Sequence, residues 1–312
     1  MRNILPGLPV ALLLVVLGLP PRSSLAAPSS SDCLIASADV PEVHKGLLKG
    51  YLPDNAGPDS LQLLPPPPQL GQPEHALDDT VSLRSFPLPG TPRWNLAAAD
   101  ADLRFPQAAS TFSCAIGAPI SEETTPTLVM LLRRTLTDAG LSTYKAKNHY
   151  GRKRPFLVNG KPICSPQDRV LLTTDPSYPS GHTAVGWAWA LILSEMVPER
   201  RNEILARGLA YGESRHLCNV HWASDVMNGR VMGAAAVALL HTNADFEADF
   251  IAAKAEVEAA KARSLPPSRD CAAASAAQSR RTRPERLRPA SLPSAPPDTA
   301  AHRSRGCRIP SA

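Results

Sequence analysis

Apolar residues recur through the middle of the chain with the spacing of amphipathic and buried helices, while the strict alternation of strands is nearly absent. This pattern predicts an all-α fold, with a helical domain over residues 74–262. The predicted helices are residues 93–103, 122–140, the apolar run that follows Gly181, 198–214, and 223 to about 262.

Residues typical of helix ends support several of these boundaries. Ser121 is followed by Glu122 and Glu123, which suits an N-cap with acidic residues in the first turn. Gly140 lies where a C-cap glycine is expected, and Pro198 suits a first helical turn. We therefore expect a helix that begins after Ser121 and ends at Gly140.

The first 26 residues have the pattern of a secretory signal peptide. Arg2 precedes an apolar run over residues 8–19, and residues 24–26 provide a small-residue cleavage pattern. The run is too short to span a bilayer, and no later segment reaches about 18 uninterrupted apolar residues. We expect a periplasmic or secreted protein with no membrane span after signal cleavage.

Two segments of unusual composition flank the predicted domain. Residues 27–73 contain LLPPPPQLGQP, in which four consecutive prolines exclude helix and favour an extended linker or a strap over the surface. Residues 263–312 are rich in Ala, Arg, Pro and Ser and have almost no large apolar side chains. Such a composition predicts a disordered tail.

The net charge of +5 is unevenly distributed along the chain. Nine arginines and three acidic residues give residues 264–312 a charge of +6, and two arginines give residues 1–26 a charge of +2. Residues 27–263 therefore carry −3. We expect no nucleic-acid partner for this mildly acidic body, whereas salt-sensitive binding of DNA or a membrane by the tail stays open beside the domain's own activity.

Six cysteines are compatible with disulfides in an exported protein. Four lie in the body of the chain and two lie near its end: Cys33, Cys114, Cys164, Cys218, then Cys271 and Cys307. No C-x-x-C pair is present, so the sequence does not predict a thiol-ligated metal. The four body cysteines allow three pairings, which the sequence does not rank.

The first of three stretches that carry candidate chemistry is KNHYGRKRP. It contains Lys147 and, after six intervening residues, Arg154 followed by Pro155. Taken alone, a basic run of this kind is more often a solvated face than a binding site.

The second stretch is PSGH, residues 179–182. It forms a turn into a helix whose first amides have no internal partner, and these amides and the helix dipole attract an anion such as phosphate. Ser180 can cap the helix or donate its hydroxyl, and Gly181 lets the backbone approach a ligand closely. His182 would then face an anion, although by itself it could equally be a capping histidine.

The third stretch, GESRHLCNVHWASDVMNG, contains Arg215, His221 and Asp225. If residues 221–225 are helical, His221 and Asp225 share one face and can form a hydrogen bond. A carboxylate on one imidazole nitrogen fixes the tautomer and leaves the other nitrogen free as a base or nucleophile. A single pair of this kind is weak evidence, because surface helices contain many.

Together the three stretches supply two histidines, an orienting acid, three cations and a helix N-terminus. This set suits phosphoryl transfer without a metal or another cofactor, because the transition state spreads negative charge over the phosphoryl oxygens. Arg154 and Arg215 can bind these oxygens in bidentate fashion, and Lys147 adds a point charge. Preorganised charge is commonly the largest catalytic contribution, ~3–4 kcal/mol for a single donor.

The combined pattern K-x6-R-P, P-S-G-H and S-R-x5-H-x3-D resembles the signature of the type 2 phosphatidic acid phosphatase and vanadium haloperoxidase superfamily. Within it, the chain most resembles the secreted bacterial class A nonspecific acid phosphatases, from about Leu48 to Phe250. The stretches that carry this likeness are LLPPPP, RWNLAAADADL, STYKAKNHYGRKRPF, SYPSGHT and GESRHLCNVHWASDV. The resemblance implies the helical bundle of that superfamily, no cofactor, and, more weakly, a homodimer.

The resemblance also implies residue roles and a substrate class. His221 would attack phosphorus to form a phosphohistidine, with Asp225 orienting it. His182 would protonate the leaving alcohol and later activate water. The phosphate would be bound by Lys147, Arg154, Ser180, Gly181 and Arg215. Substrates would be small phosphate esters such as nucleotides, sugar phosphates and aryl phosphates.

Other activities with the same signature must be weighed. A vanadate-dependent haloperoxidase would hold vanadate in the same residues, with His221 as ligand, but those enzymes are generally much longer. A membrane lipid phosphatase normally needs several spanning helices, and the sequence predicts none. Phosphoryl transfer to alcohols or nucleosides stays open, because water and an alcohol could both intercept a phosphohistidine. The sequence does not fix the preferred ester.

Overall fold

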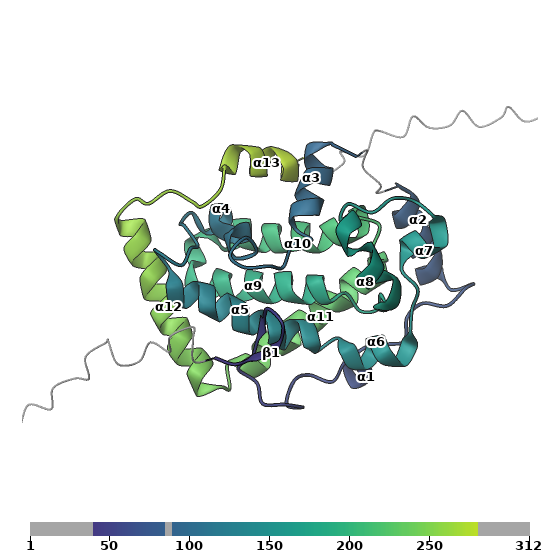
Figure 1. Cartoon of the computed structure of the whole chain (residues 1–312), viewed down its shortest axis with the longest axis horizontal. Helices are drawn as coiled ribbons and strands as arrows, with labels where there is room; N and C mark the ends of the chain where they lie inside the picture. Colours follow the sequence, from purple (N-terminus) through teal and green to yellow (C-terminus); the bar gives the residue numbers. More distant parts are fainter. Residues whose placement is uncertain (1–39, 85–88, 280–312) are drawn as a thin grey trace, which may run out of the picture. The chain divides into compact units, whose positions relative to one another are not determined.

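The computed structural model describes residues 40–84 and 89–279, and those from Pro41 onward belong to one structural unit. Helices dominate it, which confirms the all-α prediction (Figure 1). The one sheet among the described residues is a two-stranded hairpin, β1 (Glu42–His44) and β2 (Leu47–Leu48). The α-helices are, in chain order, α1 (Ser60–Leu63), α2 (Pro73–Arg84), α3 (Pro92–Ala99), α4 (Ser113–Ile116), α5 (Pro126–Leu141), α6 (Tyr144–Tyr150), α7 (Pro155–Asn159), α8 (Arg169–Thr174), α9 (Gly181–Met196), α10 (Arg201–Leu217), α11 (Ala223–Leu240), α12 (Ala244–Ala262) and α13 (Cys271–Ser279).

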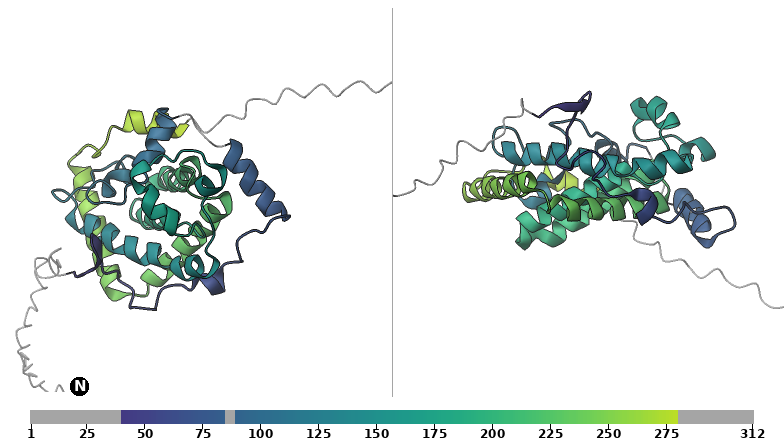
Figure 2. Two further views of the ribbon diagram at one scale, coloured as in Figure 1. Left: turned by 45° about the vertical axis from the view of Figure 1, so that its right-hand side comes forward. Right: turned by 90° about the horizontal axis from the view of Figure 1, so that it is seen from below.

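Helix α9 is the central helix of the bundle, because it is apolar on almost every side. It packs against α5, α10 and α11, which run alongside it in Figure 1. Of its two tryptophans, Trp189 is fully buried, and the Trp189 indole N–H donates to the carbonyl oxygen of Leu132 at 3.1 Å. Figure 2 shows the same helices from two other sides. The residues at the start of α9 therefore stand on a rigid support.

Two glycines in α11 let that helix lie directly against the start of α9. A Cβ at Gly229 would come within 2.5 Å of the Ser180 carbonyl oxygen, and one at Gly233 within 2.5 Å of the Ala184 carbonyl oxygen. Both distances are well below van der Waals contact, so any larger residue would push the helices apart. The glycines thus fix the turn at Ser180 relative to α11.

Helix α5 begins later than the sequence analysis predicts. Ser121 is not its N-cap: the helix starts at Pro126, with Thr125 as the N-cap. That prediction was wrong because Pro126 suits the first helical position and restricts the residue before it to non-helical conformations. The Ser121 carbonyl instead accepts from the Thr125 N–H in a turn, at 2.9 Å. At the other end, the helix continues through Gly140 to Leu141, so Gly140 is not its C-cap.

The predicted helix over residues 223–262 is in fact two helices, α11 and α12. Asn243 begins the second one, because its side-chain oxygen accepts from the Phe246 N–H at 3.0 Å. Asp245 lies in the first turn, where a negative charge is favourable. An Asn followed by an acid is a recognisable start signal, which the apolar pattern alone obscured.

Two other predicted helices are confirmed with shifted ends. The predicted helix 93–103 corresponds to α3, which begins one residue earlier, at Pro92, and ends at Ala99. The segment 198–214 contains a 3-10 turn, Pro198–Arg200, that leads directly into α10. Pro198 therefore does occupy a first helical position.

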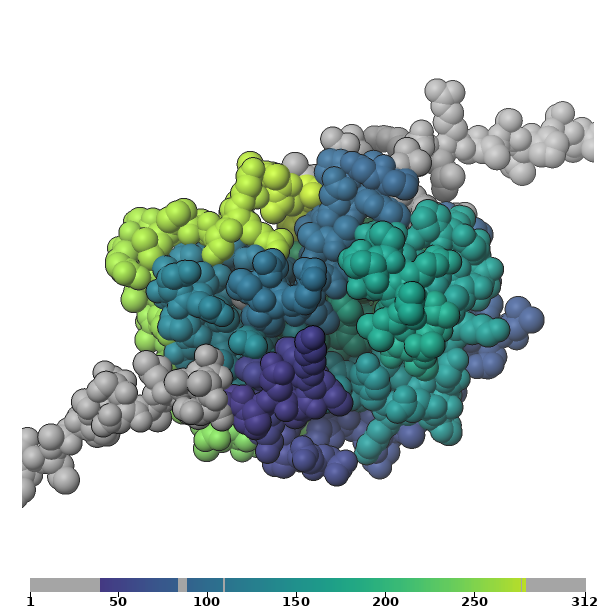
Figure 3. Space-filling view, viewed as in Figure 1, coloured from purple at the N-terminus to yellow at the C-terminus, as the bar shows by residue number. Residues whose placement is uncertain are grey.

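The described part of the proline-rich segment, residues 40–73, lies against the helices. The hairpin packs on α5, and α1 packs on α6. The Tyr51 N–H donates to the Asp138 carboxylate at 2.9 Å, and the Tyr178 hydroxyl donates to the Pro65 carbonyl at 2.5 Å. In the space-filling view, the hairpin borders a hollow in the surface (Figure 3).

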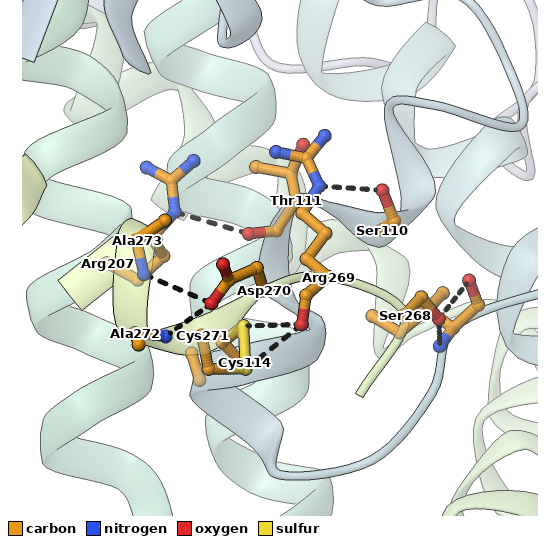
Figure 4. Close-up of a disulfide and its surroundings, with 12 residues drawn as sticks. Ser110, Thr111, Cys114, Arg207, Ser268, Arg269, Asp270, Cys271, Ala272 and Ala273 are labelled. Carbon is orange, nitrogen blue, oxygen red and sulfur yellow. Dashed lines mark hydrogen bonds between the residues drawn. A yellow bond between two sulfur atoms is a disulfide. The ribbon is translucent and has the colours of Figure 1, made fainter. Parts of the chain in front are cut away.

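The beginning of the predicted disordered tail is ordered, so that prediction was wrong for residues 264–279. Helix α13 packs on α3, and Cys271 at its start forms a disulfide with Cys114 (Figure 4). The Ile120 N–H donates to Ser268 Oγ at 2.9 Å, and Arg269 Nε donates to Ser110 Oγ at 2.8 Å. A disulfide and polar contacts hold this segment in place. The prediction of disorder considered only its lack of large apolar side chains. Residues 280–312 and the predicted signal peptide lie outside the described residues.

A second disulfide joins Cys164 to Cys218. This bond joins two of the four body cysteines, as expected. Cys114 instead pairs with Cys271, near the end of the chain. Cys218 follows the last residue of α10, so the bond ties that helix end to the segment before α8. Cys33 lies outside the described residues, as does Cys307.

Candidate active site

A cavity of about 560 Å³ opens between the hairpin, α5, the segment 101–105 and α8. It corresponds to the hollow beside the hairpin in Figure 3. Six of the eight predicted site residues line it: Lys147, Arg154, Gly181, His182, Arg215 and His221. The other two, Ser180 and Asp225, are fully buried behind this layer. The structure therefore brings the three motifs together.

His221 is held at both ring nitrogens. Its Nδ1 lies 3.3 Å from Asp225 Oδ2, and its Nε2 lies 3.0 Å from Arg154 Nη1. Because a guanidinium only donates, Nε2 is the acceptor, and this network assigns the ring proton to Nδ1. Burial, followed by the charges of Arg154, Lys147 and Arg215, lowers the pKa of His221 well below its usual value. The ring therefore presents an unprotonated Nε2.

The backbone around this pair differs from the prediction. Helix α11 begins at Ala223, so His221 precedes the helix and does not share a helical face with Asp225. Asp225 occupies the first turn, where its carboxylate also accepts from the Trp222 N–H at 2.9 Å. The acid thus caps the helix and orients the histidine at once.

Asp225 is bound on its other oxygen by Arg152. Arg152 Nη1 donates to Asp225 Oδ1 at 2.6 Å, and Nη2 donates to Asp78 Oδ2 at 2.7 Å. Asp78, from α2, accepts from the N–H and hydroxyl of Ser224 at 2.8 and 2.6 Å. Burial raises the pKa of Asp225, and the charge of Arg152 opposes that shift. Arg152 therefore favours the ionised carboxylate that His221 needs as a partner.

His182 has a simpler environment. Its ring Nε2 lies 3.0 Å from the carbonyl oxygen of Ala101, to which it donates. Burial, followed by the charge of Arg215, lowers the pKa of His182 well below its usual value. Ala101 lies two residues beyond the end of α3, so this helix helps to set the position of the ring.

Ser180 is the N-cap of α9. Its hydroxyl oxygen accepts from the Thr183 N–H at 3.3 Å and from the Thr183 hydroxyl at 2.9 Å, and its own N–H donates to the Asp225 carbonyl at 3.0 Å. Gly181 follows at the edge of the cavity. The first backbone N–H groups of α9 lie here, and they have no hydrogen-bond partner within the helix. The turn is thus fixed by its own contacts, and a phosphate contact from Ser180 stays a prediction.

The three predicted phosphate-binding cations differ in what they contact. Arg154 Nη2 and Lys147 Nζ both donate to Asp175 Oδ2, at 2.5 and 3.2 Å. Arg215 is buried, and its Nε and Nη1 have no hydrogen-bond partner among the described residues. Burial lowers the pKa of Lys147 to about 8 and that of Arg215 to about 10. An anion in the cavity would supply the partner that buried Arg215 lacks.

Comparison with known proteins identifies the family of the chain. Residues 126–247 match the PAP2 superfamily. A non-specific acid phosphatase from Providencia stuartii is 44% identical over 207 residues, which cover 66% of this chain and 84% of that protein. The chain belongs to the PAP2 superfamily. Its relatives also include an acid phosphatase from Zymomonas mobilis, 41% identical over 65% of this chain and 77% of the relative. A non-specific acid phosphatase from Salmonella typhimurium is 42% identical over 59% and 74%.

These relatives place the protein among the acid phosphatases of the PAP2 superfamily, as the sequence signature predicts. Over residues 40–84 and 89–279, no helix of this PAP2 phosphatase is both long and apolar enough to cross a bilayer. The same residues contain no group of three or more His, Cys, Asp or Glu side chains placed to hold a metal ion.

The sequence analysis missed three charged residues of this PAP2 site. Asp175 stands shortly before the PSGH turn, so an acid beside an anion-binding motif was a usable signal. Arg152 lies inside KNHYGRKRP, but nothing distinguished it from its basic neighbours. Asp78 has no local signal, because its partner Ser224 is 146 residues away in the chain.

Proposed function

We propose that this acid phosphatase hydrolyses phosphate monoesters through a phosphohistidine at His221, without a metal ion. The observation that carries the proposal is the placement of His221 at the cavity, with Nε2 3.0 Å from Arg154 Nη1 and Nδ1 directed to Asp225, an arrangement that favours an unprotonated Nε2. An imidazole with this tautomer is a competent nucleophile toward phosphorus.

In the first step, the Nε2 lone pair forms a bond to phosphorus while the ester P–O bond breaks. The leaving oxygen takes a proton from His182. Lys147, Arg154 and Arg215 bind the phosphoryl oxygens, on which the transition state concentrates negative charge. In the second step, His182 accepts a proton from water, the water oxygen attacks phosphorus, and the P–N bond breaks to release phosphate.

The contact between His182 and Ala101 indicates which ring nitrogen moves the proton. As long as Nε2 donates to the Ala101 carbonyl, that nitrogen keeps its hydrogen. The proton that reaches the leaving oxygen is then the one on Nδ1. In this scheme Ala101 fixes the tautomer of the acid, as Asp225 fixes that of the nucleophile.

The two lowered pKa values favour activity at acidic pH. His221 must be unprotonated, and its low pKa keeps it so as the pH falls. His182 must be protonated although its pKa is also lowered in the ligand-free protein, so acidic pH and the negative charge of a bound ester both help to load its proton. These demands predict a bell-shaped pH profile on the acidic side of neutrality.

The decisive experiment is the capture of the intermediate. The enzyme is mixed with a ³²P-labelled aryl phosphate, quenched rapidly under alkaline denaturing conditions, and digested for mass spectrometry. We expect label on His221 and none in H221A, which should stay folded by circular dichroism and release no phosphate. H149A is the matched control, because His149 is exposed, and it should label normally. Retained turnover in H221A would overturn the assignment.

A substrate panel at about pH 5–7, with and without EDTA, tests the remaining parts. We expect chelator-insensitive phosphate release from nucleotides, sugar phosphates and aryl phosphates. Loss of activity with EDTA and recovery with a divalent ion would contradict the metal-independent mechanism.

Export to the periplasm or the medium is part of the proposal. It is supported by the predicted signal peptide over residues 1–26 and by two disulfides, which are typical of oxidising compartments. N-terminal sequencing of the protein from a fractionated native host should place the first residue near position 27. An intact N-terminus in the cytoplasmic fraction would contradict it.

A further inference from the structure

One face of α5 lines the cavity over two helical turns. The residues that contribute to it follow helical spacing: Arg133, Leu136, Thr137, Gly140 and Leu141. At one end, a Cβ on Gly181 would lie 3.7 Å from the Gly140 carbonyl oxygen, so Gly140 adjoins the start of α9. Arg133 is seven residues earlier, about 10 Å along the helix axis. It therefore lines the part of the cavity remote from the PSGH turn.

Arg133 is half-buried, and its charge is not committed to an acid. Its guanidinium carbon lies 5.5 Å from the centre of the Phe105 ring. Within the described part of the chain, Arg133 has no hydrogen bond and no ion pair, unlike Arg104, which binds Asp102 through two bonds of 2.8 and 2.9 Å. A guanidinium on an aromatic face keeps its N–H edge available for a ligand.

The other charges around the cavity divide unevenly. Three acids also line it. Asp102 is paired with Arg104, Asp175 is paired with Lys147 and Arg154, and Asp168 acts on Arg104 and Arg215. Lys45, an exposed residue at the hairpin turn, is a second cation that lines the cavity, and it forms no ion pair within residues 40–84 and 89–279. The residues of the hairpin and α5 that line the cavity thus include two cations and no acid.

We propose that Arg133, supported by Lys45, forms a second anion subsite that selects phosphate monoesters whose leaving group carries its own anionic group. A substrate with its ester phosphate on His221 and Arg215 would extend along α5 and place a second phosphate, phosphonate or carboxylate near Arg133. This inference rests on the proposed function, because it assigns the leaving group to the remote part of the same cavity. Arg133 is then a specificity-determining residue.

The competing explanation is that Arg133 only packs on Phe105. In that case its removal would weaken the local structure or affect every substrate alike. A subsite for an anionic leaving group predicts something different, namely an effect that depends on the charge of the part of the substrate that departs.

The test uses two substrates that share one aryl ring, 4-(phosphonomethyl)phenyl phosphate and 4-methylphenyl phosphate. The C–P bond of the phosphonate is not hydrolysed, so only one reaction occurs in each case. We measure kcat/KM for wild type, R133Q, R133K, K45Q and R201Q at low salt. R201Q removes the same charge from an exposed residue at the start of α10 that does not line the cavity.

Wild type should prefer the phosphonate-bearing substrate by about tenfold, as expected for one charge-assisted contact. R133Q should abolish the preference through loss on that substrate alone, R133K should keep part of it, and K45Q should reduce it by about twofold. R201Q should match wild type, and added salt should weaken the preference. The proposal is overturned if wild type shows no preference, or if R133Q lowers both kcat/KM values equally. Absence of phosphate release from 4-methylphenyl phosphate would instead contradict the proposed function.

Discussion

The two histidines of the cavity are held in contrasting ways. His221 is the first member of a buried chain of charged groups that continues through Asp225 and Arg152 to Asp78 on another helix. Within the described part of the chain, the His182 ring has one hydrogen bond, to the backbone carbonyl of Ala101. One ring is fixed by three ionisable side chains in series, and the other by a neutral backbone group that does not titrate.

This difference matches the demands that the proposed mechanism places on each ring. A nucleophile must keep one tautomer and one orientation throughout, which a charged network provides. An acid that becomes a base must gain and lose a proton, and a neutral carbonyl leaves that equilibrium free to respond to the substrate's charge. In this mechanism the tautomer and orientation of His221 are fixed, whereas the protonation of His182 can follow the charge of the substrate.

Among variants that keep the proposed nucleophile, removing His182 should give the largest effect, and one that depends on the leaving group. In H182A, kcat/KM for an alkyl phosphate should fall by about 10²–10⁴-fold, the usual contribution of a general acid. For 2,4-dinitrophenyl phosphate the loss in kcat/KM should be far smaller, because that leaving group needs no proton. The measurement is kcat/KM over a series of leaving-group pKa values, since kcat also contains the hydrolysis of the phosphohistidine, which His182 assists for every ester. An equal loss for all esters would assign His182 to binding rather than to proton transfer.

Cutting the charged chain at Arg152 should have the next largest effect. R152Q leaves two buried carboxylates without their cation, so the pKa of Asp225 should rise further and its hold on His221 should weaken. We expect kcat to fall by about 10–100-fold, the acidic limb of the pH profile to move to higher pH, and R152K to recover part of the activity.

Ser224 provides the matched control for that variant. S224A removes one contact to Asp78 and one to Arg152 but keeps the Arg152–Asp225 pair, so its pH profile should stay in place. If R152Q lowers kcat without moving the profile, Arg152 acts on the fold and not on the ionisation of Asp225.

Anion binding should take up a proton at His182 and not at His221. The pKa of His182 is lowered by burial and by Arg215, and a bound dianion counters that shift. Sulfate is a suitable probe because it does not titrate near neutrality, and its affinity should rise by up to about tenfold per pH unit as the pH falls through the ligand-bound pKa. Calorimetry in buffers of different ionisation enthalpy measures the uptake, which should disappear in H182N. Proton uptake that persists in H182N would show that a group other than His182 binds the proton.

The smallest effect concerns stability, where the two histidines behave alike. Burial lowers the pKa values of His182 and His221, and it lowers that of His216 to about 4. The unfolded chain therefore binds protons below about pH 6.5 that the folded chain does not, so stability is lost as the pH falls. We expect Tm to drop by roughly 5–10 °C between pH 6.5 and 5. Sulfate should reduce the drop, and a Tm independent of pH would contradict the buried neutral state.

The sequence was informative where the chemistry is local. The PSGH turn and the cations of KNHYGRKRP and GESRH could be predicted as site residues, because the residues of each motif lie within a few positions of one another in the sequence. In the structure, residues from all three motifs line the same cavity. Asp78 could not be named, because its contact with Ser224 depends on how α2 packs on α11.

The fold shows the same division. The apolar pattern located the central helix α9, but it placed the start of α5 before Pro126 and ran α11 into α12, since periodicity does not report caps. Helix α13 was missed for another reason. Its attachment depends on Cys114, 157 residues earlier, and no local pattern encodes a partner at that distance.

That long-range disulfide has a practical consequence when a protease cuts the folded protein. All eight residues of the proposed site lie between Cys114 and Cys271, so they belong to one covalently closed ring of polypeptide. A single backbone cut anywhere inside that ring opens it without releasing a fragment. Nicked molecules should therefore migrate as one chain on non-reducing gels and separate into pieces only after a thiol is added.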